Sequence, residues 1–506
     1  MKIREGVGID MNLMYKSTRD SNNRVSASQA ILQGLASDGG LYVPETIPVL
    51  LKTVKELSCM DYRELAFEVM KLFLTDYTEE ELKDCINKAY DNKFDTPEIA
   101  PLKNVGEAYY LELYHGATIA FKDMALSVLP HLLTKAAKKN AVKEEIVILT
   151  ATSGDTGKAA LAGFADVEGT RIIVFYPKDG VSSVQEKQMV TQRGNNTEVI
   201  GIRGNFDDAQ NGVKAMFHNN ELAERMKKAG YLFSSANSIN IGRLVPQIVY
   251  YVYSYVTLYK NKQIAEGEKI NFVVPTGNFG NILAAYYAKC MGIPIDKLIC
   301  ASNENKVLFD FFTSGHYDKN REFILTDSPS MDILVSSNLE RLIYHIAGND
   351  SIKTAQLMNA LSSKGSYEIT DSMKANLQGF IAGWASIRET KEAIHQIYVK
   401  KGYVIDTHTA VAASVYYKYV NETKDRTKTV IVSTASPYKF AQSVLGAIQN
   451  DVIPKDDYEQ AELLKKVSGI DIPNAVDEIR TAPVLHEKTC EINKMQTVVE
   501  DILKII

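Results

Sequence analysis

Apolar residues recur at helical spacing through much of the first hundred residues. Amphipathic runs cover 61–73 and 78–90, and the second begins with Thr78 and three glutamates, residue types that stabilise a helix N-terminus. Between residues 38 and 44, the turn signal Asp-Gly-Gly leads into Leu-Tyr-Val-Pro. We therefore predict a mainly helical N-terminal region over residues 1–100.

From about residue 105, short β-branched runs alternate with helical patterns. Strands are predicted at 146–150, 171–176, 271–276 and 429–433, and helices at 156–164 and from Asn281 onward. Strand, loop and helix in repeated order indicate parallel sheets covered by helices, with ligands at the carboxyl ends of the strands. This α/β core is predicted to cover 101–455, followed by a charged, helical tail over 456–506.

The composition, 45% hydrophobic and 24% charged over 506 residues with a net charge of −5, is that of an ordinary globular protein. It gives no basic surface for nucleic acid or for a membrane. The most apolar long stretch, 248–258, is broken by tyrosines and too short to span a bilayer, and residues 1–10 contain no apolar run typical of a signal peptide.

Five scattered cysteines, none in a Cys-x-x-Cys pair, argue against a disulfide framework and a zinc site. They favour a reducing compartment. The eight histidines show no metal-ligand spacing. We expect a cytoplasmic protein that has no metal site and no nucleic-acid or membrane partner.

A lysine stands in an apolar setting at a predicted helix start. Lys122 follows Phe121 and precedes Asp123. It can be a lysine whose stem lies on apolar surface while its amine reaches water. It can also be a Schiff-base lysine, whose amine is partly desolvated so that it loses its proton and attacks an aldehyde.

A glycine-containing loop, Gly-Asn-Phe-Gly-Asn at 277–281, joins a predicted strand to a helix. Glycines allow close approach of the backbone to an anion, and a helix N-terminus offers free N–H groups. The loop lacks the lysine and hydroxyl of a nucleoside triphosphate loop, so a cofactor phosphate fits it better than ATP. A tight structural turn is the alternative.

Three further polar segments follow predicted strands or precede helices. Residues 152–157 could hold a carboxylate or phosphate through N–H and hydroxyl donors. Residues 237–243 contain two amides, a hydroxyl and Arg243, which could grip a phosphate. Residues 433–437 follow a strand directly. Each segment alone could equally be a capped helix or a strand-end turn.

Taken in order, these segments resemble the threonine synthase family from Tyr15 to about residue 450. The chain resembles the enterobacterial and fungal branch of that family. The segments that carry the resemblance lie at 15–19, 34–44, 115–123, 152–157, 185–187, 237–243, 277–281, 406–411 and 433–440.

The resemblance implies a pyridoxal-phosphate (PLP) enzyme of fold type II, with two parallel-sheet α/β domains around a cleft and an N-terminal helical region. Lys122 would bond to PLP, and Thr434 would face its pyridine nitrogen. The cofactor phosphate would be held by Gly277, Asn278, Phe279, Gly280 and Asn281. The substrate would contact Ser153, Asp155 and Thr156, and its phosphate Ser238, Asn240 and Arg243.

The sequence departs from the family pattern at two of these segments. Asn281 stands where the family often has aspartate, and Ser436 where it commonly has histidine. An amide at 281 can donate a hydrogen bond to phosphate, so phosphate binding is still expected there.

The implied reaction converts O-phospho-L-homoserine and water to L-threonine and phosphate by β,γ-elimination and replacement, with Lys122 moving protons. Two alternatives remain open. One is a PLP-dependent phospho-lyase that releases 2-oxobutyrate, which the reaction product would distinguish. The other is a non-catalytic homologue, which would lack the yellow colour of bound PLP.

Overall fold

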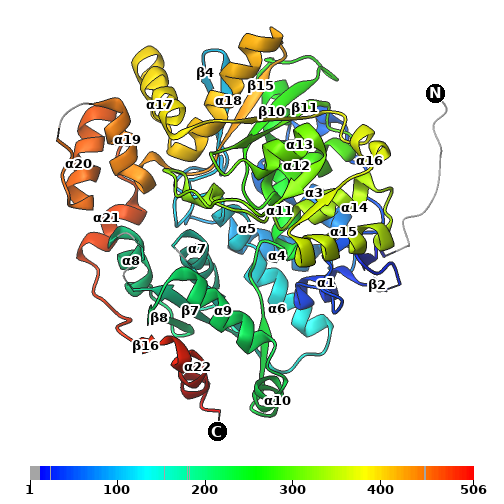
Figure 1. Cartoon of the computed structure of the whole chain (residues 1–506), viewed down its shortest axis with the longest axis vertical. Coiled ribbons are helices and arrows are strands. Elements are labelled where there is room, and N and C mark those ends of the chain that lie inside the picture. The colour runs from blue at the N-terminus through cyan, green and yellow to red at the C-terminus, as the bar shows by residue number, and fades with distance from the viewer. Residues whose placement is uncertain are drawn as a thin grey trace.

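Two mainly parallel β-sheets organise the chain in the computed structural model, which describes residues 12–22, 24–152, 154–178, 180–181, 183–449 and 452–505. The expected α/β class with two parallel sheets is confirmed (Figure 1). The large sheet has the order β14 (Phe380–Trp384), β11 (Ile295–Ser302), β10 (Ile270–Pro275), β15 (Thr429–Ser433), β5 (Ala108–Glu112), β4 (Leu102–Val105), and only β4 is antiparallel to its neighbour. The small sheet is parallel throughout, in the order β16 (Thr489–Glu491), β8 (Thr197–Arg203), β7 (Thr170–Pro177), β6 (Glu145–Ala151), β9 (Tyr231–Ser234).

The chain passes between the two sheets more than once. It leaves the large sheet after β5, builds β6 to β9 of the small sheet, and returns for β10, β11, β14 and β15. All residues of β10 and β15 are buried, as expected for central strands covered by helices on both faces. The four strands predicted from sequence are confirmed to within one or two residues.

Long helices cover the sheets. The most apolar stretch of the sequence lies in α11 (Ile241–Lys260), which packs against α12 (Gly280–Cys290) and α3 (Tyr62–Phe73). On the other face of the large sheet, α18 (Thr407–Thr423) packs against α17 (Ile387–Lys401). The small sheet carries α7 (Asp155–Phe164) and α9 (Phe206–Phe217). Among the described helices, none has both the length and the apolar character needed to cross a membrane.

The N-terminal region contains both predicted helices. They are α3, which begins after Asp61, and α4 (Glu79–Ala89), which begins after Thr78, and both have capping boxes. The region also contains α1 (Ala27–Gln33), α2 (Val54–Leu57) and an antiparallel sheet of β2 (Arg24–Val25), β1 (Tyr15–Ser17) and β3 (Tyr42–Pro44). Strands of two or three residues are too short for a periodic pattern, so the sequence did not predict this sheet. Residues 1–10, where no signal peptide was expected, lie outside the described residues.

The C-terminal segment crosses from one sheet to the other. Helices α19 (Ala441–Ile448) and α20 (Asp457–Ser468) lie near α17. Helix α21 (Asn474–Thr481) contacts α8 (Ser183–Val190), β16 joins the small sheet, and α22 (Met495–Leu503) packs on α9 (Figure 1). The domain boundaries at residues 100 and 455 remain predictions. The remaining elements are α5 (Asp123–Leu126), α6 (Leu129–Lys139), α10 (Asn220–Lys228), α13 (Val307–Ser314), β12 (His316–Asp318), η1 (Pro329–Met331), α14 (Leu339–Ile346), α15 (Ser351–Lys364), β13 (Ser366–Glu368), α16 (Asp371–Ala375), η2 (Pro437–Phe440) and η3 (Ile492–Lys494).

Candidate active site

Lys122 lies at the start of α5, where the segment after β5 meets the segment after β15. The backbone N–H of Phe121 donates to the carbonyl oxygen of Thr434 at 2.8 Å, and that of Ser436 donates to Ile119 at 3.0 Å. Because β5 and β15 are neighbours in the large sheet, their carboxyl ends bring Lys122 and Thr434 together. The predicted PLP lysine and the predicted ring contact therefore lie on adjacent segments.

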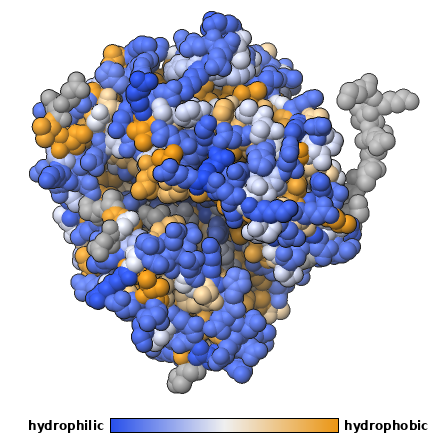
Figure 2. Space-filling view, viewed as in Figure 1, coloured by the Kyte–Doolittle hydropathy of each residue, from blue (hydrophilic) through white to orange (hydrophobic). Residues whose placement is uncertain are grey.

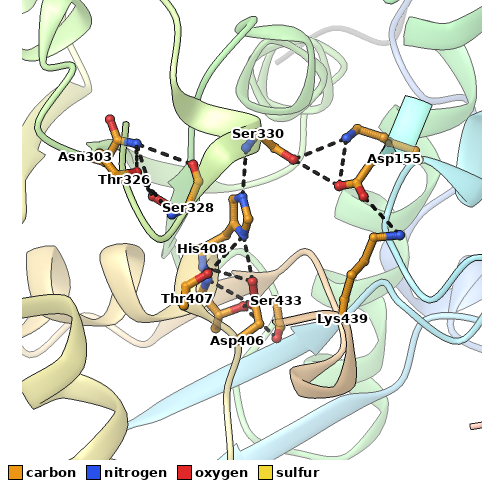
Figure 3. A network of polar contacts seen from close by, with 12 residues as sticks. Asp155, Asn303, Thr326, Ser328, Ser330, Asp406, Thr407, His408, Ser433 and Lys439 are labelled. Atoms are coloured by element: carbon orange, nitrogen blue, oxygen red, sulfur yellow. Dashed lines mark hydrogen bonds and ion pairs between the residues drawn. The ribbon is translucent and has the colours of Figure 1, made fainter. Parts of the chain in front are cut away.

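The amine of Lys122 lies 3.2 Å from Oδ2 of Asp155 and donates to the hydroxyl of Ser330 at 3.3 Å. Ser330 in turn donates to the same carboxylate oxygen at 3.1 Å. The other oxygen of Asp155 pairs with Nζ of Lys439 at 3.1 Å. Figure 3 shows Asp155 between Ser330 on one side and Lys439 on the other. Two amines and a hydroxyl thus converge on one carboxylate.

The charges of this cluster shift the titration of its members. Burial lowers the pKa of Lys122, and the carboxylate of Asp155 only partly opposes this shift. For Asp155, burial would raise the pKa, but the charges of Lys122 and Lys439 hold it well below its usual range. Asp155 is therefore ionised at neutral pH, and Lys122 gives up its proton more readily than a surface lysine does.

A buried aspartate and histidine support the turn that carries Ser330. His408, in the first turn of α18, accepts from the backbone N–H of Ser330 at 3.1 Å and bonds to Asp406 at 2.8 Å (Figure 3). Asp406 is fully buried, and its carboxylate also accepts from the backbone N–H groups of His408 and Thr409. The orientation of the imidazole is fixed by these bonds.

The glycine loop lies directly against this turn. A side chain at Gly277 would come within 2.7 Å of the carbonyl oxygen of Ser330, so only glycine fits. Phe279 has a left-handed backbone (φ 66°) and caps α12, which begins at Gly280. The hydroxyl of Ser336 donates to the carbonyl oxygen of Gly277 at 2.6 Å. The loop is thus held by the chain segment that connects η1 to α14.

Two buried nitrogen donors near these loops lack partners. The hydroxyls of Tyr250 and Tyr251 both donate to Oδ1 of Asn281 at 2.6 Å, which orients its amide. Arg243 donates one N–H to Ala236 at 3.0 Å. Among the described residues, neither Nδ2 of Asn281 nor Nε of Arg243 has a hydrogen-bond partner.

Burial lowers the pKa of Arg243 to about 10, so its guanidinium is still charged at neutral pH. A buried donor without a partner is unfavourable, and a buried cation without an anion even more so. Phosphate oxygens would supply the missing acceptors at both positions. The residues present therefore fit the phosphate group of a cofactor and that of a second ligand.

The other predicted contacts differ in what their side chains do. Asn240 is fully buried; its amide nitrogen donates to Ile31 and Ser235, and its oxygen accepts from Gly242. Asn240 therefore holds the turn before α11, and its side chain has no donor left for a substrate. Ser238 is half-buried and bonds to the neighbouring Asn237.

Thr156 lies half-buried in the first turn of α7, and Ser153 lies outside the described residues.

The sequence did not predict two residues of this polar cluster, Ser330 and Lys439. Lys439 lies two residues after Pro437, in the polar segment that follows a strand, and this position could have indicated a site residue. Ser330 lies in a segment without a recognisable motif.

Models of three protein families match successive parts of the chain. "Threonine synthase N terminus" matches residues 14–90, "Pyridoxal-phosphate dependent enzyme" 95–435 and "Threonine synthase, C-terminal" 409–482. The chain belongs to the threonine synthase family. The resemblance inferred from the sequence motifs is thereby confirmed, and PLP is the cofactor of this family.

Known members of the threonine synthase family align along most of the chain. Threonine synthase of Saccharomyces cerevisiae is 35% identical over 510 residues, covering 92% of this chain and 98% of the yeast protein. The yeast crystal structure superposes with a TM-score of 0.87 over 98% of this chain and 99% of that one, at 33% identity. A PLP-bound threonine synthase from Brucella melitensis gives a TM-score of 0.83 at 32% identity, over 97% and 99% of the two chains.

Human threonine synthase-like 1 is 37% identical over 504 residues, covering 95% of this chain. The chain spans only 64% of the length of that protein. The family therefore includes relatives longer than this chain.

Proposed function

We propose that this protein is a threonine synthase that converts O-phospho-L-homoserine and water to L-threonine and phosphate. The observation that carries the proposal is a pair of unpartnered buried donors on two helices that pack against each other. Nδ2 of Asn281 belongs to the glycine loop and α12, and Nε of Arg243 belongs to α11. A site with two such positions suits two phosphates, one from the cofactor and one from the substrate.

In this proposal, Lys122 bonds to PLP and Thr434 faces the pyridine nitrogen. The loop of Gly277, Asn278, Phe279, Gly280 and Asn281 holds the cofactor phosphate at the N-terminus of α12, where free N–H groups and the helix dipole favour an anion. PLP, when bound, withdraws the electrons released at the substrate α carbon.

The remaining steps fall to side chains of this chain. Lys122 takes a proton from the substrate and returns it, which its lowered pKa favours near neutral pH. Arg243 and Ser238 hold the phosphate of the substrate. Asp155, Thr156 and Ser153 contact the rest of the substrate molecule.

All five cysteines are free, which supports a reducing compartment such as the cytoplasm.

The test is to purify the protein, record its absorbance with PLP and follow O-phospho-L-homoserine by NMR. We expect a PLP–lysine absorbance band and equal amounts of threonine and phosphate. Release of 2-oxobutyrate in place of threonine would make the protein a phospho-lyase. Failure to bind PLP would show that it is a non-catalytic member of the family.

A further inference from the structure

Arg341 in α14 is a fully buried guanidinium whose recorded partners are all neutral oxygens. It donates to the carbonyl oxygen of Tyr42 at 2.9 Å, to that of Ile239 at 2.6 Å and to the side-chain oxygen of Asn338. The neighbouring carboxylate of Glu340 bonds instead to Arg19, at 2.8 Å. Arg341 thus brings a positive charge into the interior without neutralising it in a direct ion pair.

Two partners of Arg341, Ile239 and Asn338, link it to the two turns that carry the proposed phosphate contacts. Ile239 lies in the turn before α11. Asn338, which is also fully buried, donates its backbone N–H to Asn278 at 3.0 Å and its side-chain amide to Ser238 at 3.3 Å. Arg341 and Asn338 therefore connect the glycine loop to the Ser238 turn. The bond to Tyr42 adds strand β3 of the N-terminal sheet to the same connection.

The charge of Arg341 has a physical consequence for anions. Burial lowers its pKa to about 10, so it is protonated at neutral pH. A desolvated cation bonded only to neutral oxygens is less stable than one near an anion. With Arg243, it makes the neighbourhood of both turns positive, and the binding of phosphates there would relieve that charge.

We propose that Arg341 is a positioning residue that couples the two phosphate sites. It holds the Asn278 loop and the Ser238 turn in a fixed relation and places a positive charge next to both. The assignment of the Ser238 turn to the substrate rests on the proposed function. Loss of Arg341 should therefore weaken the binding of PLP and of O-phospho-L-homoserine together. It should affect binding more than the chemical steps.

The experiment compares Arg341→Met and Arg341→Lys with the control Arg19→Met in the full chain. Arg19 also ties the N-terminal sheet to α14, through Glu340, but none of its bonds reaches either turn. The measurements are the PLP dissociation constant of the apoenzyme, KM and kcat for O-phospho-L-homoserine, and Tm.

We expect Arg341→Met to raise both the PLP dissociation constant and KM by about ten- to a hundredfold, as for loss of a charge-assisted contact, with a much smaller change in kcat. Arg341→Lys should recover part of the affinity for both ligands, because lysine keeps the charge but cannot reach three acceptors. Arg19→Met should lower Tm and leave both affinities unchanged.

The proposal is overturned if Arg341→Met lowers Tm as Arg19→Met does while both affinities stay at wild-type values. If Arg341→Met does not fold, the affinities of Arg341→Lys are the test. Wild-type affinities of that variant for both ligands would overturn the proposal. If the wild-type protein makes no threonine, the proposed function fails separately. PLP affinity then decides, and an unchanged dissociation constant in Arg341→Met overturns the coupling.

Discussion

The imidazole of His408 accepts a hydrogen bond from the backbone N–H of Ser330, with the two nitrogens 3.1 Å apart. A backbone N–H can only donate, so Nε2 of His408 carries no proton. The ring proton lies on Nδ1, which donates to Asp406 at 2.8 Å. His408 therefore holds the turn that places the Ser330 hydroxyl against Lys122 and Asp155.

Replacing His408 should test this support. His408→Phe keeps the ring and its packing on Phe440 but removes the acceptor, and should lower kcat for threonine formation about tenfold, in line with one lost buried hydrogen bond. His408→Gln offers an acceptor oxygen near the position of Nε2 and should recover part of that loss. Steady-state kinetics and Tm measure both. Wild-type kcat in the phenylalanine variant would show that the turn holds its position without His408.

Lys122→Ala should abolish the PLP–lysine absorbance band and threonine formation together, while the circular dichroism spectrum stays that of the wild type. Borohydride reduction of the wild-type holoenzyme, followed by peptide mapping, should place the PLP label on the peptide containing Lys122. A label on another lysine would refute the assignment.

The charges around Lys122 predict opposite pH shifts for two variants. Asp155 raises the pKa of Lys122 and Lys439 lowers it. Because the neutral amine is the form that reacts with PLP, Asp155→Asn should move the acid limb of the rate of PLP binding to apoenzyme toward lower pH. Lys439→Met should move it toward higher pH. Stopped-flow absorbance at several pH values measures both, and a shift of both variants in the same direction would contradict this account.

Arg243→Lys should weaken the binding of O-phospho-L-homoserine far more than the binding of PLP. Lysine keeps the charge but loses the planar fork of donors, and we expect a loss of about 1–3 kcal/mol in substrate binding. KM and the PLP dissociation constant of the variant are the two measurements. An equal loss for both ligands would move Arg243 to the cofactor phosphate, and no loss would leave it a structural residue.

Thr434→Asp should change the products more than substrate binding. A hydroxyl can donate to the pyridine nitrogen, whereas a carboxylate beside it favours a proton on that nitrogen. A protonated ring withdraws more electron density from the substrate and opens side routes such as transamination, which lower the threonine yield. NMR of the product mixture measures this. Wild-type rate and products would show that Thr434 does not face the cofactor ring.

Local signals made some of these features predictable from the sequence. The capped helix starts at Asp61 and Thr78 and the strand at 429–433 each carry their own pattern within a few residues. Lys122 and the loop that begins at Gly277 belong to recognisable motifs. Asn240 lies in such a motif, but its bonds are those of a helix cap, because a helix cap and a phosphate contact use the same residue type.

Other features depend on contacts between distant parts of the chain. Ser330 meets Lys122 across 208 positions, and Arg341 meets Tyr42 across 299. No pattern near either residue specifies the partner, since the fold alone brings the two segments together. The polar cluster around Asp155 and the link between the two phosphate turns could be recognised only in three dimensions.

The path of the chain between the two sheets also determines when the folded protein can first form during its synthesis. The carbonyl oxygen of Thr118 accepts from Lys439, 321 positions later, and Arg203 at the end of β8 pairs with Glu491 at the end of β16, 288 positions later. Strand β15 lies between β5 and β10, so a nascent chain lacks a central strand of the large sheet until most of it has left the ribosome. Long-range pairing of this kind slows folding and leaves apolar strands uncovered. We expect the nascent chain to need protection from aggregation and to gain PLP only after synthesis is nearly complete.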